Sequence, residues 1–304
     1  LRWRLIKDIL RIQPDVLWTN NKLGLYFIGM SLRLLKYPIV MEVIGCPDAS
    51  TYKGFGFFLM KKRLSELMAI STETARQLEI ASFDPARITV VYDTIDFDLT
   101  IAKSTQPTAP LPSDGLRPAI LLPANLIPKK GQPTAIKAVA ELKKTGLEPV
   151  LWIAGDVVGN DYSYQRSLEK MITDLKLENN IHLIGWRSDV PSIMKKADVV
   201  ILPTHEEGFG HVILEAMLLK VPVIATAVGG IKDSIEDNVN GILMAVDDYK
   251  ALADGIAKIY HDPVFKEKLV ENGYRTVTQR FSPENHTKLF MQAIMKAVKN
   301  RKHG

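Results

Sequence analysis

The stretch VVILPTHEEGFGHVILEAML, residues 199–218, reads as a short apolar strand, a turn containing two glycines and an apolar helix. Such a βα unit, when repeated, favours a parallel sheet covered by helices on both faces. The stretch also places Glu215 among apolar residues on nearly every side of its helix, where a carboxylate without hydrogen-bond partners is costly. We therefore predict a polar ligand or partner for Glu215.

The same alternation runs through residues 118–280. The pattern predicts strands at 119–123, 149–154, 181–184, 199–202, 221–225 and 241–244, and helices at 132–144, 164–175, 190–196, 211–219, 231–236 and 249–260. This number of βα units indicates a doubly wound, Rossmann-like domain, which binds ligands at the carboxyl ends of its strands. Residues 281–304 are expected to form a C-terminal helix that crosses back to the N-terminal domain.

Residues 1–100 show a weaker alternation. Here the pattern predicts helices at 2–12, 23–35, 58–67 and from Ser71, and strands at 16–18, 38–43, 67–70 and 88–91. Residues 101–117 are rich in proline, serine and threonine, which is typical of a linker. We therefore expect an α/β protein with two Rossmann-like domains, 1–100 and 118–280, that face a cleft, the kind of place that ligand sites prefer.

Composition narrows the class of protein. The 304 residues are 46% hydrophobic and 24% charged, with a formal charge of +5 and Cys46 as the single cysteine. These values fit a soluble cytoplasmic protein, and the longest apolar run, 23–35, is too short to span a bilayer. No nucleic-acid-binding motif is present, and the basic excess favours anionic ligands or an anionic surface. Trp3 and its basic neighbours suit peripheral contact with a membrane, although such a helix more often covers a sheet.

The turn after residues 199–202 has the features of an anion site. Gly208 and Gly210 allow backbone amides to approach a ligand, and the following helix directs its free N–H groups to the same place, which suits phosphate. Glu207 lies in this turn, and Glu215 points back toward the helix start, where it can accept hydrogen bonds from a ribose diol. A tight turn followed by a half-exposed glutamate is the alternative interpretation.

Two patterns resemble metal-binding motifs, but their sequence context argues against a metal. Asp96, Phe97 and Asp98 imitate a D-x-D metal motif, but their place beside the linker favours a hinge turn. His205 and His211 are six residues apart across a glycine turn, whereas a helical zinc box needs histidines four apart. We predict no metal.

Beyond these local patterns, the stretch resembles the E-x7-E motif of the GT-B retaining glycosyltransferases of family 4. The resemblance continues through Leu214 to Met217, Lys220 to Thr226, Gly229-Gly230 and Asn240-Gly241. Upstream it includes Pro128 to Gly131, Gly185 to Pro191 and Ala197 to Val199. It covers 120–290 closely and the first hundred residues loosely, and as a set it is far more specific than a lone glycine motif.

The resemblance implies roles for particular residues. Glu215 would hold the ribose of the nucleotide, Glu207 would contact the transferred sugar, and amides of Gly208, Phe209 and Gly210 would contact sugar and diphosphate. Lys130 matches the lysine that neutralises the leaving diphosphate without a metal. Gly185, Trp186 and Arg187 match the loop that packs on the base.

Three departures accompany the resemblance. Asn125 stands where the family usually has an arginine, so it offers a neutral amide in place of a charge. Ile44 stands where the family often has a histidine, and it cannot form a side-chain hydrogen bond. Family members also begin with a strand and a glycine-rich loop before the helix matched by 2–12, so we interpret the N-terminal domain as incomplete.

The preferred hypothesis is a metal-independent, retaining glycosyltransferase (a hexosyltransferase-type enzyme) without a cofactor, which uses a UDP- or GDP-linked sugar and a glycan or lipid-linked acceptor. Polysaccharide biosynthesis at the inner face of a membrane is the setting that the resemblance implies. The alternatives are a nucleotide-sugar-binding module without turnover and a nucleotide-sugar epimerase.

Overall fold

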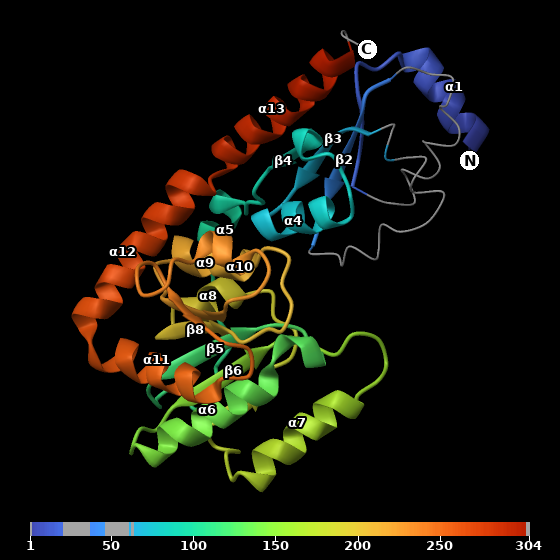
Figure 1. The fold of residues 1–304 in the computed structure, drawn as a ribbon. Coiled ribbons are helices and arrows are strands. Elements are labelled where there is room, and N and C mark those ends of the chain that lie inside the picture. The colour runs from blue at the N-terminus through green and yellow to red at the C-terminus, as the bar shows by residue number, and fades with distance from the viewer. Residues whose placement is uncertain (1, 21–36, 46–60, 62–63, 302–304) are drawn as a thin grey trace. The chain divides into compact units, whose positions relative to one another are not determined.

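Two parallel sheets organise the chain, one in each of two units (Figure 1). The computed structural model describes residues 2–20, 37–45, 61 and 64–301. The first unit comprises Leu1–Asp93 and Glu284–Gly304, and the second comprises Thr94–Pro283. The predicted helix 23–35, Cys46 and half of the predicted helix 58–67 lie outside the described residues.

The sheet of the second unit has six parallel strands in the order β10-β9-β8-β5-β6-β7. Their bounds are β5 Ala119–Pro123, β6 Val150–Ala154, β7 Ile181–Leu183, β8 Val199–Leu202, β9 Val223–Thr226 and β10 Ile242–Met244. Counted along the chain, this is the 3-2-1-4-5-6 order of a doubly wound fold. Strands β6 and β7 are therefore added on one side of β5, and β8, β9 and β10 are added on the other. The order reverses between β5 and β8, which pair in the middle of the sheet.

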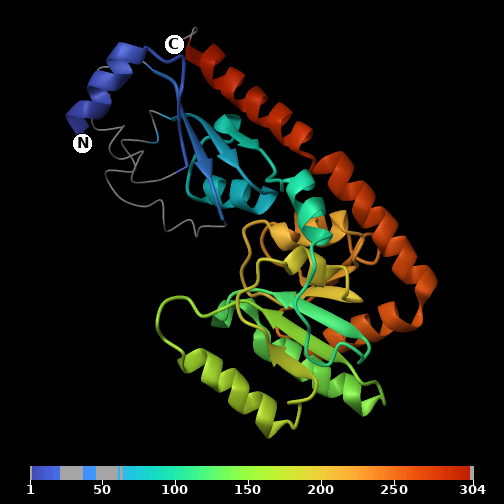
Figure 2. The same cartoon turned by 180° about the vertical axis from the view of Figure 1, so that it is seen from behind.

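Helices cover both faces of this sheet, as Figures 1 and 2 show. They are α5 Phe97–Ser104, α6 Gln132–Lys144, α7 Ser163–Asp174, α8 Val190–Met194, α9 His211–Leu218, α10 Ile231–Ser234, α11 Tyr249–His261 and α12 Pro263–Arg280. Ile120 and Leu122 on β5 share a buried cluster with residues of α6, α7 and α11. On the other face α9 packs against α8 and α12. Side chains alternate between the faces of a strand, so strands covered on both faces read as continuous apolar runs.

The first unit has a four-stranded parallel sheet in the order β1-β2-β3-β4. Its elements are α1 Arg2–Ile12, β1 Leu17–Thr19, β2 Ile39–Val43, β3 Leu64–Ala69, α4 Thr72–Ile80, β4 Ile88–Val90 and α13 Pro283–Arg301. Met41 of β2 packs on the same face as Leu78 of α4, whereas its neighbour Val40 packs with Ala293 of α13. The C-terminal helix thus covers one face of this sheet, and α4 covers the other. Together the two sheets confirm the predicted α/β class.

One helix prediction was wrong where the structure describes it. Residues 64–67, assigned to the end of a helix, belong to strand β3, which pairs with β2 and β4. A short apolar run has no periodicity that separates a strand from a buried helix, so its partners decide. The helix predicted from Ser71 is confirmed, and the Ser71 hydroxyl accepts a hydrogen bond from the Thr74 N–H as its cap.

The segment 101–117 is more tightly held than a linker. Its first residues complete α5, and Asp96 caps this helix by accepting a hydrogen bond from the Leu99 N–H. The Ser192 hydroxyl lies 2.6 Å from the Lys103 carbonyl oxygen, and the indole N–H of buried Trp152 donates to the Pro112 carbonyl at 2.9 Å. The prolines from residue 107 onward disfavour regular helix and strand, but they do not exclude packing against a domain.

No helix among the described residues combines the length and apolar composition needed to cross a bilayer.

Candidate functional site at the centre of the second sheet

The loops that follow β5 and β8 leave the same edge of the second sheet in opposite directions. In doubly wound folds a crevice opens at this point, and ligands bind there. A cavity of about 420 Å³ lies at this place. It is lined by Pro123, Ala124, Asn125, Lys130, Ala154, Gly155, Trp186, Arg187, Val190, Leu202, Glu207, Gly210, His211, Val212 and Glu215. Seven of the ten residues singled out from the sequence therefore line one cavity, although they come from three separate loops and a helix.

The remaining three predicted residues border this cavity without lining it. Gly208 follows Glu207 and donates its N–H to Glu207 Oε1 at 3.1 Å. The Phe209 side chain is buried against Phe281, with ring centroids 5.4 Å apart, so only its backbone is available to a ligand. Gly185 has a φ of +67°, and its carbonyl accepts a hydrogen bond from the Gly155 N–H.

Lys130 and Glu207 form an ion pair inside the cavity. The distance from Lys130 Nζ to Glu207 Oε2 is 2.7 Å, and each side chain is about one-fifth exposed. Lys130 ends the short 3-10 turn Pro128–Lys130 after β5, whereas Glu207 lies in the loop after β8. An anionic ligand that enters the cavity can therefore replace the Glu207 carboxylate as the partner of Lys130.

Backbone packing around Glu207 requires a glycine. The Gly230 N–H approaches the Glu207 carbonyl oxygen at 3.4 Å, and Gly229 has a φ of +52°. A Cβ at position 229 would lie 1.8 Å from the same oxygen. The Gly229-Gly230 pair noted in the sequence thus fixes the backbone that carries Glu207.

Glu215 is half-buried in the first half of α9 and lines the cavity. Burial raises the pKa of its carboxyl group, and the nearby charges of His211 and Lys103 lower it in part. Within the part of the chain that the structure describes, its carboxylate makes no hydrogen bond or ion pair. This is the arrangement expected of a carboxylate that receives its hydrogen bonds from a ligand.

Sequence reasoning missed Lys103 and gave His211 no role. Both line a second cavity of about 600 Å³, which shares five residues with the first: Trp186, Arg187, Val190, His211 and Glu215. Lys103 is in the last turn of α5, in the segment interpreted as a linker. The helix cap at Asp96 was the available signal for an ordered element there.

The raised pKa of Glu215 predicts how stability changes with pH. Its carboxyl group binds a proton more tightly in the folded chain than in the unfolded chain, where the ordinary value is 4.5. Wild-type stability therefore falls as the pH rises from that value through the raised pKa. Glu215→Gln removes this loss, so we expect it to be more stable than wild type by up to about 1 kcal/mol at pH 7.5 and nearly equal at pH 4.

Urea unfolding across this pH range measures the difference. The matched control is Glu178→Gln, which alters an exposed carboxylate of the same unit. A Glu215→Gln variant that is less stable than wild type at pH 7.5 would show that its carboxylate is satisfied within the fold.

Trp186 and Arg187 occupy the loop after β7, and they differ in how freely their side chains can contact a ligand. The Trp186 side chain is 71% exposed and offers an aromatic face at the cavity. Arg187 donates two hydrogen bonds to Asp189, at 2.7 and 2.6 Å. These bonds hold the pKa of Asp189 below its usual value. The guanidinium charge is thus largely neutralised, which leaves Trp186 as the more accessible group of the two.

Asn125 is held through its backbone. Its carbonyl accepts a hydrogen bond from Gln132 Nε2 at 2.8 Å, and Gln132 Oε1 accepts one from the Tyr164 hydroxyl at 2.9 Å. Gln132 is fully buried, and burial raises the pKa of Tyr164 to about 12. In the described structure the Asn125 side chain makes no hydrogen bond of its own, so its amide is free to contact a ligand.

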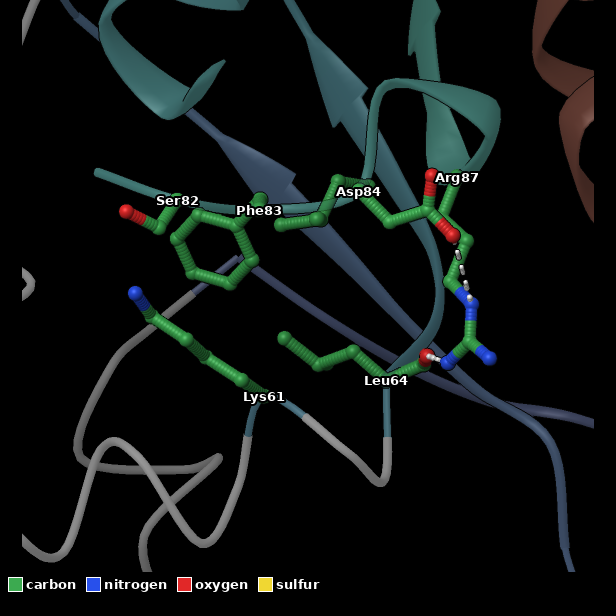
Figure 3. A pocket seen from close by; sticks show the side chains of 7 residues that line it. Lys61, Leu64, Ser82, Phe83, Asp84 and Arg87 are labelled. Carbon is green, nitrogen blue, oxygen red and sulfur yellow. Dashed lines mark hydrogen bonds and ion pairs between the residues drawn. The ribbon is translucent and has the colours of Figure 1, made fainter. Parts of the chain in front are cut away.

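Another cavity, of about 350 Å³, lies in the first unit (Figure 3). It is beside the amino ends of β3 and β4, the opposite end from that where parallel sheets bind ligands. Its two cations are engaged by the fold: Lys61 donates to the Ala81 carbonyl, and Arg87 donates to the Leu64 carbonyl at 2.9 Å. We therefore assign the candidate site to the second unit.

Comparison with known proteins relates this chain to glycosyltransferases. A family model described as glycosyl transferases group 1 matches residues 108–276. The lipopolysaccharide core biosynthesis glycosyltransferase LpsE of Rhizobium meliloti is 29% identical over 177 residues, which are 58% of this chain and 49% of that protein. Alpha-D-kanosaminyltransferase of Streptomyces kanamyceticus is 30% identical over 168 residues, which are 55% of this chain and 42% of that protein. The chain thus spans about half the length of the curated relatives it matches.

Among solved structures, HepE of Anabaena in complex with UDP aligns with a TM-score of 0.85 and 22% identity, over 97% of this chain and 81% of that chain. At this level of identity the likeness concerns the fold, which is that of the GT-B glycosyltransferases.

Proposed function

Because the chain belongs to the glycosyl transferases group 1 family, we propose that it is a retaining, family 4 glycosyltransferase that moves a sugar from a nucleotide diphosphate to an acceptor hydroxyl. The acceptor is a glycan or a lipid-linked glycan, at the cytoplasmic face of a membrane. The observation that carries the proposal is the half-buried carboxylate of Glu215, which has no partner in the described fold and faces a cavity that also holds Lys130.

The geometry supports a division of roles among the cavity residues. Glu215 accepts hydrogen bonds from the ribose hydroxyls, and the exposed ring of Trp186 stacks on the base. Lys130 binds the diphosphate, which receives the bonding electrons when the anomeric C–O bond breaks. A fixed cation at this place stabilises the leaving anion without the need for a metal.

Glu207 changes partner in this scheme. It pairs with Lys130 at 2.7 Å and accepts the Gly208 N–H. When the diphosphate takes up Lys130 and the Gly208 amide, the carboxylate becomes available to the hydroxyls of the sugar. Glu207 thereby orients the sugar only when the donor is in place.

Titration calorimetry with UDP, GDP and ADP tests the proposal. We expect one nucleotide, UDP first, to bind wild type in the micromolar to millimolar range. Glu215→Gln should weaken that binding about tenfold or more, because a charged group with two acceptor oxygens is replaced by a neutral amide with only one. If none of the three nucleotides binds, or if Glu215→Gln binds as tightly as wild type, the donor-site assignment is wrong.

A second candidate function is a nucleotide-sugar-binding module without turnover. Asn125 supplies no charge to the cavity, and Ile44, which is 58% exposed at the end of β2, supplies no hydrogen bond. Release of free sugar or transfer from a labelled donor by the purified chain would exclude this alternative. Recovery of an isomerised nucleotide sugar would instead indicate an epimerase.

A further inference from the structure

The loops that carry Lys130 and Glu207 are joined through one backbone carbonyl. The Lys129 carbonyl oxygen accepts a hydrogen bond from the His205 N–H at 2.8 Å and one from the Thr204 hydroxyl at 2.8 Å. This oxygen is one residue from Lys130, and His205 is two residues from Glu207. The position of the ion pair therefore depends on how the 204–205 segment is held.

A third loop, which follows β10, holds that segment from outside the cavity. His205 Nε2 lies 2.9 Å from Asp247 Oδ1, and the hydroxyl of Thr134, in the first turn of α6, donates to the same oxygen at 2.9 Å. Thr134 is buried, whereas the His205 and Asp247 side chains are 40% and 66% exposed. One carboxylate oxygen thus connects the start of α6, which directly follows the loop that carries Lys130, with the loops that follow β8 and β10.

The backbone of Asp247 is consistent with a role for its side chain. Its φ of +62° lies in the left-handed region, which favours glycine and tolerates asparagine and aspartate. Hydrogen bonds from Thr134 first, and then from His205, keep the pKa of Asp247 below its ordinary value. A glycine would satisfy the backbone at this position, but it would not join α6 and the two loops.

We propose that Asp247 is a positioning residue for the Lys130–Glu207 pair, acting through His205 and Thr134. It does not line the cavity. Its effect on ligand binding is therefore transmitted through the loop that ends in Lys130. The inference rests on the proposed function, since the ligand that reports it is the nucleotide diphosphate.

Two substitutions at position 247 separate the side chain from the backbone. Asp247→Gly keeps the left-handed conformation and removes the carboxylate, whereas Asp247→Asn keeps an oxygen that accepts from Thr134 and His205. We expect Asp247→Gly to weaken UDP binding about three- to tenfold and Asp247→Asn to stay within about twofold of wild type. The matched control is Asn238→Gly, at another left-handed residue of the same unit with a φ of +57°, and it should leave the UDP affinity unchanged.

A double-mutant cycle with Lys130→Met distinguishes positioning from general loss of structure. If Asp247 acts through Lys130, Asp247→Gly causes no further loss of UDP affinity in the Lys130→Met background. A loss of equal size in both backgrounds, or equal effects of Asp247→Gly and Asn238→Gly, would overturn the proposal.

A second cycle needs no nucleotide and so separates this inference from the proposed function. The melting temperatures of Asp247→Gly, Glu207→Gln and the double variant should be non-additive, because the two sites share the 204–207 segment. Strictly additive shifts would overturn the positioning role. If wild type binds no nucleotide while the shifts remain non-additive, the proposed function fails and the network stands.

Discussion

Lys130→Met should lower the rate of donor cleavage about 10²- to 10³-fold, which is the cost of removing a preorganised group that stabilises charge in a transition state. The side chain of Lys130 is about one-fifth exposed, so its charge acts in a partly dry cavity. The substitution also leaves Glu207 without its cation, and the resulting negative charge repels the diphosphate. UDP affinity should therefore fall as well, by about tenfold.

The neighbouring lysine provides the matched control. Lys129 is exposed and does not line the cavity, although its backbone carbonyl accepts hydrogen bonds from the 204–205 segment. Lys129→Met should retain donor cleavage within about twofold, since surface substitutions of this kind change little. The measurement is hydrolysis of the sugar nucleotide that binds best. Equal rates for the two variants would exclude Lys130 from the leaving-group role.

Gly131→Ala should destabilise the second unit by about 3–5 kcal/mol and abolish measurable UDP binding. Gly131 has a φ of +68°, and a Cβ at this position would lie 1.8 Å from the Pro203 carbonyl oxygen. Pro203 directly follows β8, so the clash separates the two loops that carry Lys130 and Glu207. Only a backbone shift can relieve it, because the atom in contact is itself backbone.

Gly146→Ala is the control that introduces backbone strain without a clash. Gly146 also has a positive φ, of +87°, but a Cβ there would meet nothing within 4 Å. Its substitution should cost only the left-handed penalty of about 1–2 kcal/mol. Urea unfolding of both variants gives the difference. If the two alanine variants are equally stable, the close approach of the loops is not required by the fold.

The elements predicted best from the sequence are those with strong local signals. The helix 132–144 and the strands 119–123 and 199–202 were predicted to the residue. Each is a clear case of helical periodicity or of a short apolar run with defined ends. In contrast, residues 64–67 were assigned to the wrong type of element, because their pairing with β2 and β4 is not visible in the local pattern.

The candidate site likewise has residues that local sequence patterns predicted and contacts that they did not. The E-x7-E spacing and the glycines pointed to Glu207, Glu215 and Gly210, since a strand, turn and helix place them near one sheet edge by local geometry alone. Nothing in the local pattern indicated that Arg187 is held by Asp189. Nor did it indicate that Lys103, from a segment interpreted as a linker, influences the Glu215 carboxylate.

The amino-acid sequence was sufficient for the α/β class, the doubly wound second domain and the edge of the sheet where the cavity lies. Periodicity, turn residues and helix starts act over a few neighbouring residues, so they can be read directly from the chain. The contact between Lys130 and Glu207, which are 77 residues apart, and the junction of α6 with two loops at Asp247 were decided only by tertiary structure. Hydrogen bonds and ion pairs are sensitive to differences of a few tenths of an ångström in the distance between their atoms, and only the packed sheet sets the distance between remote loops so closely.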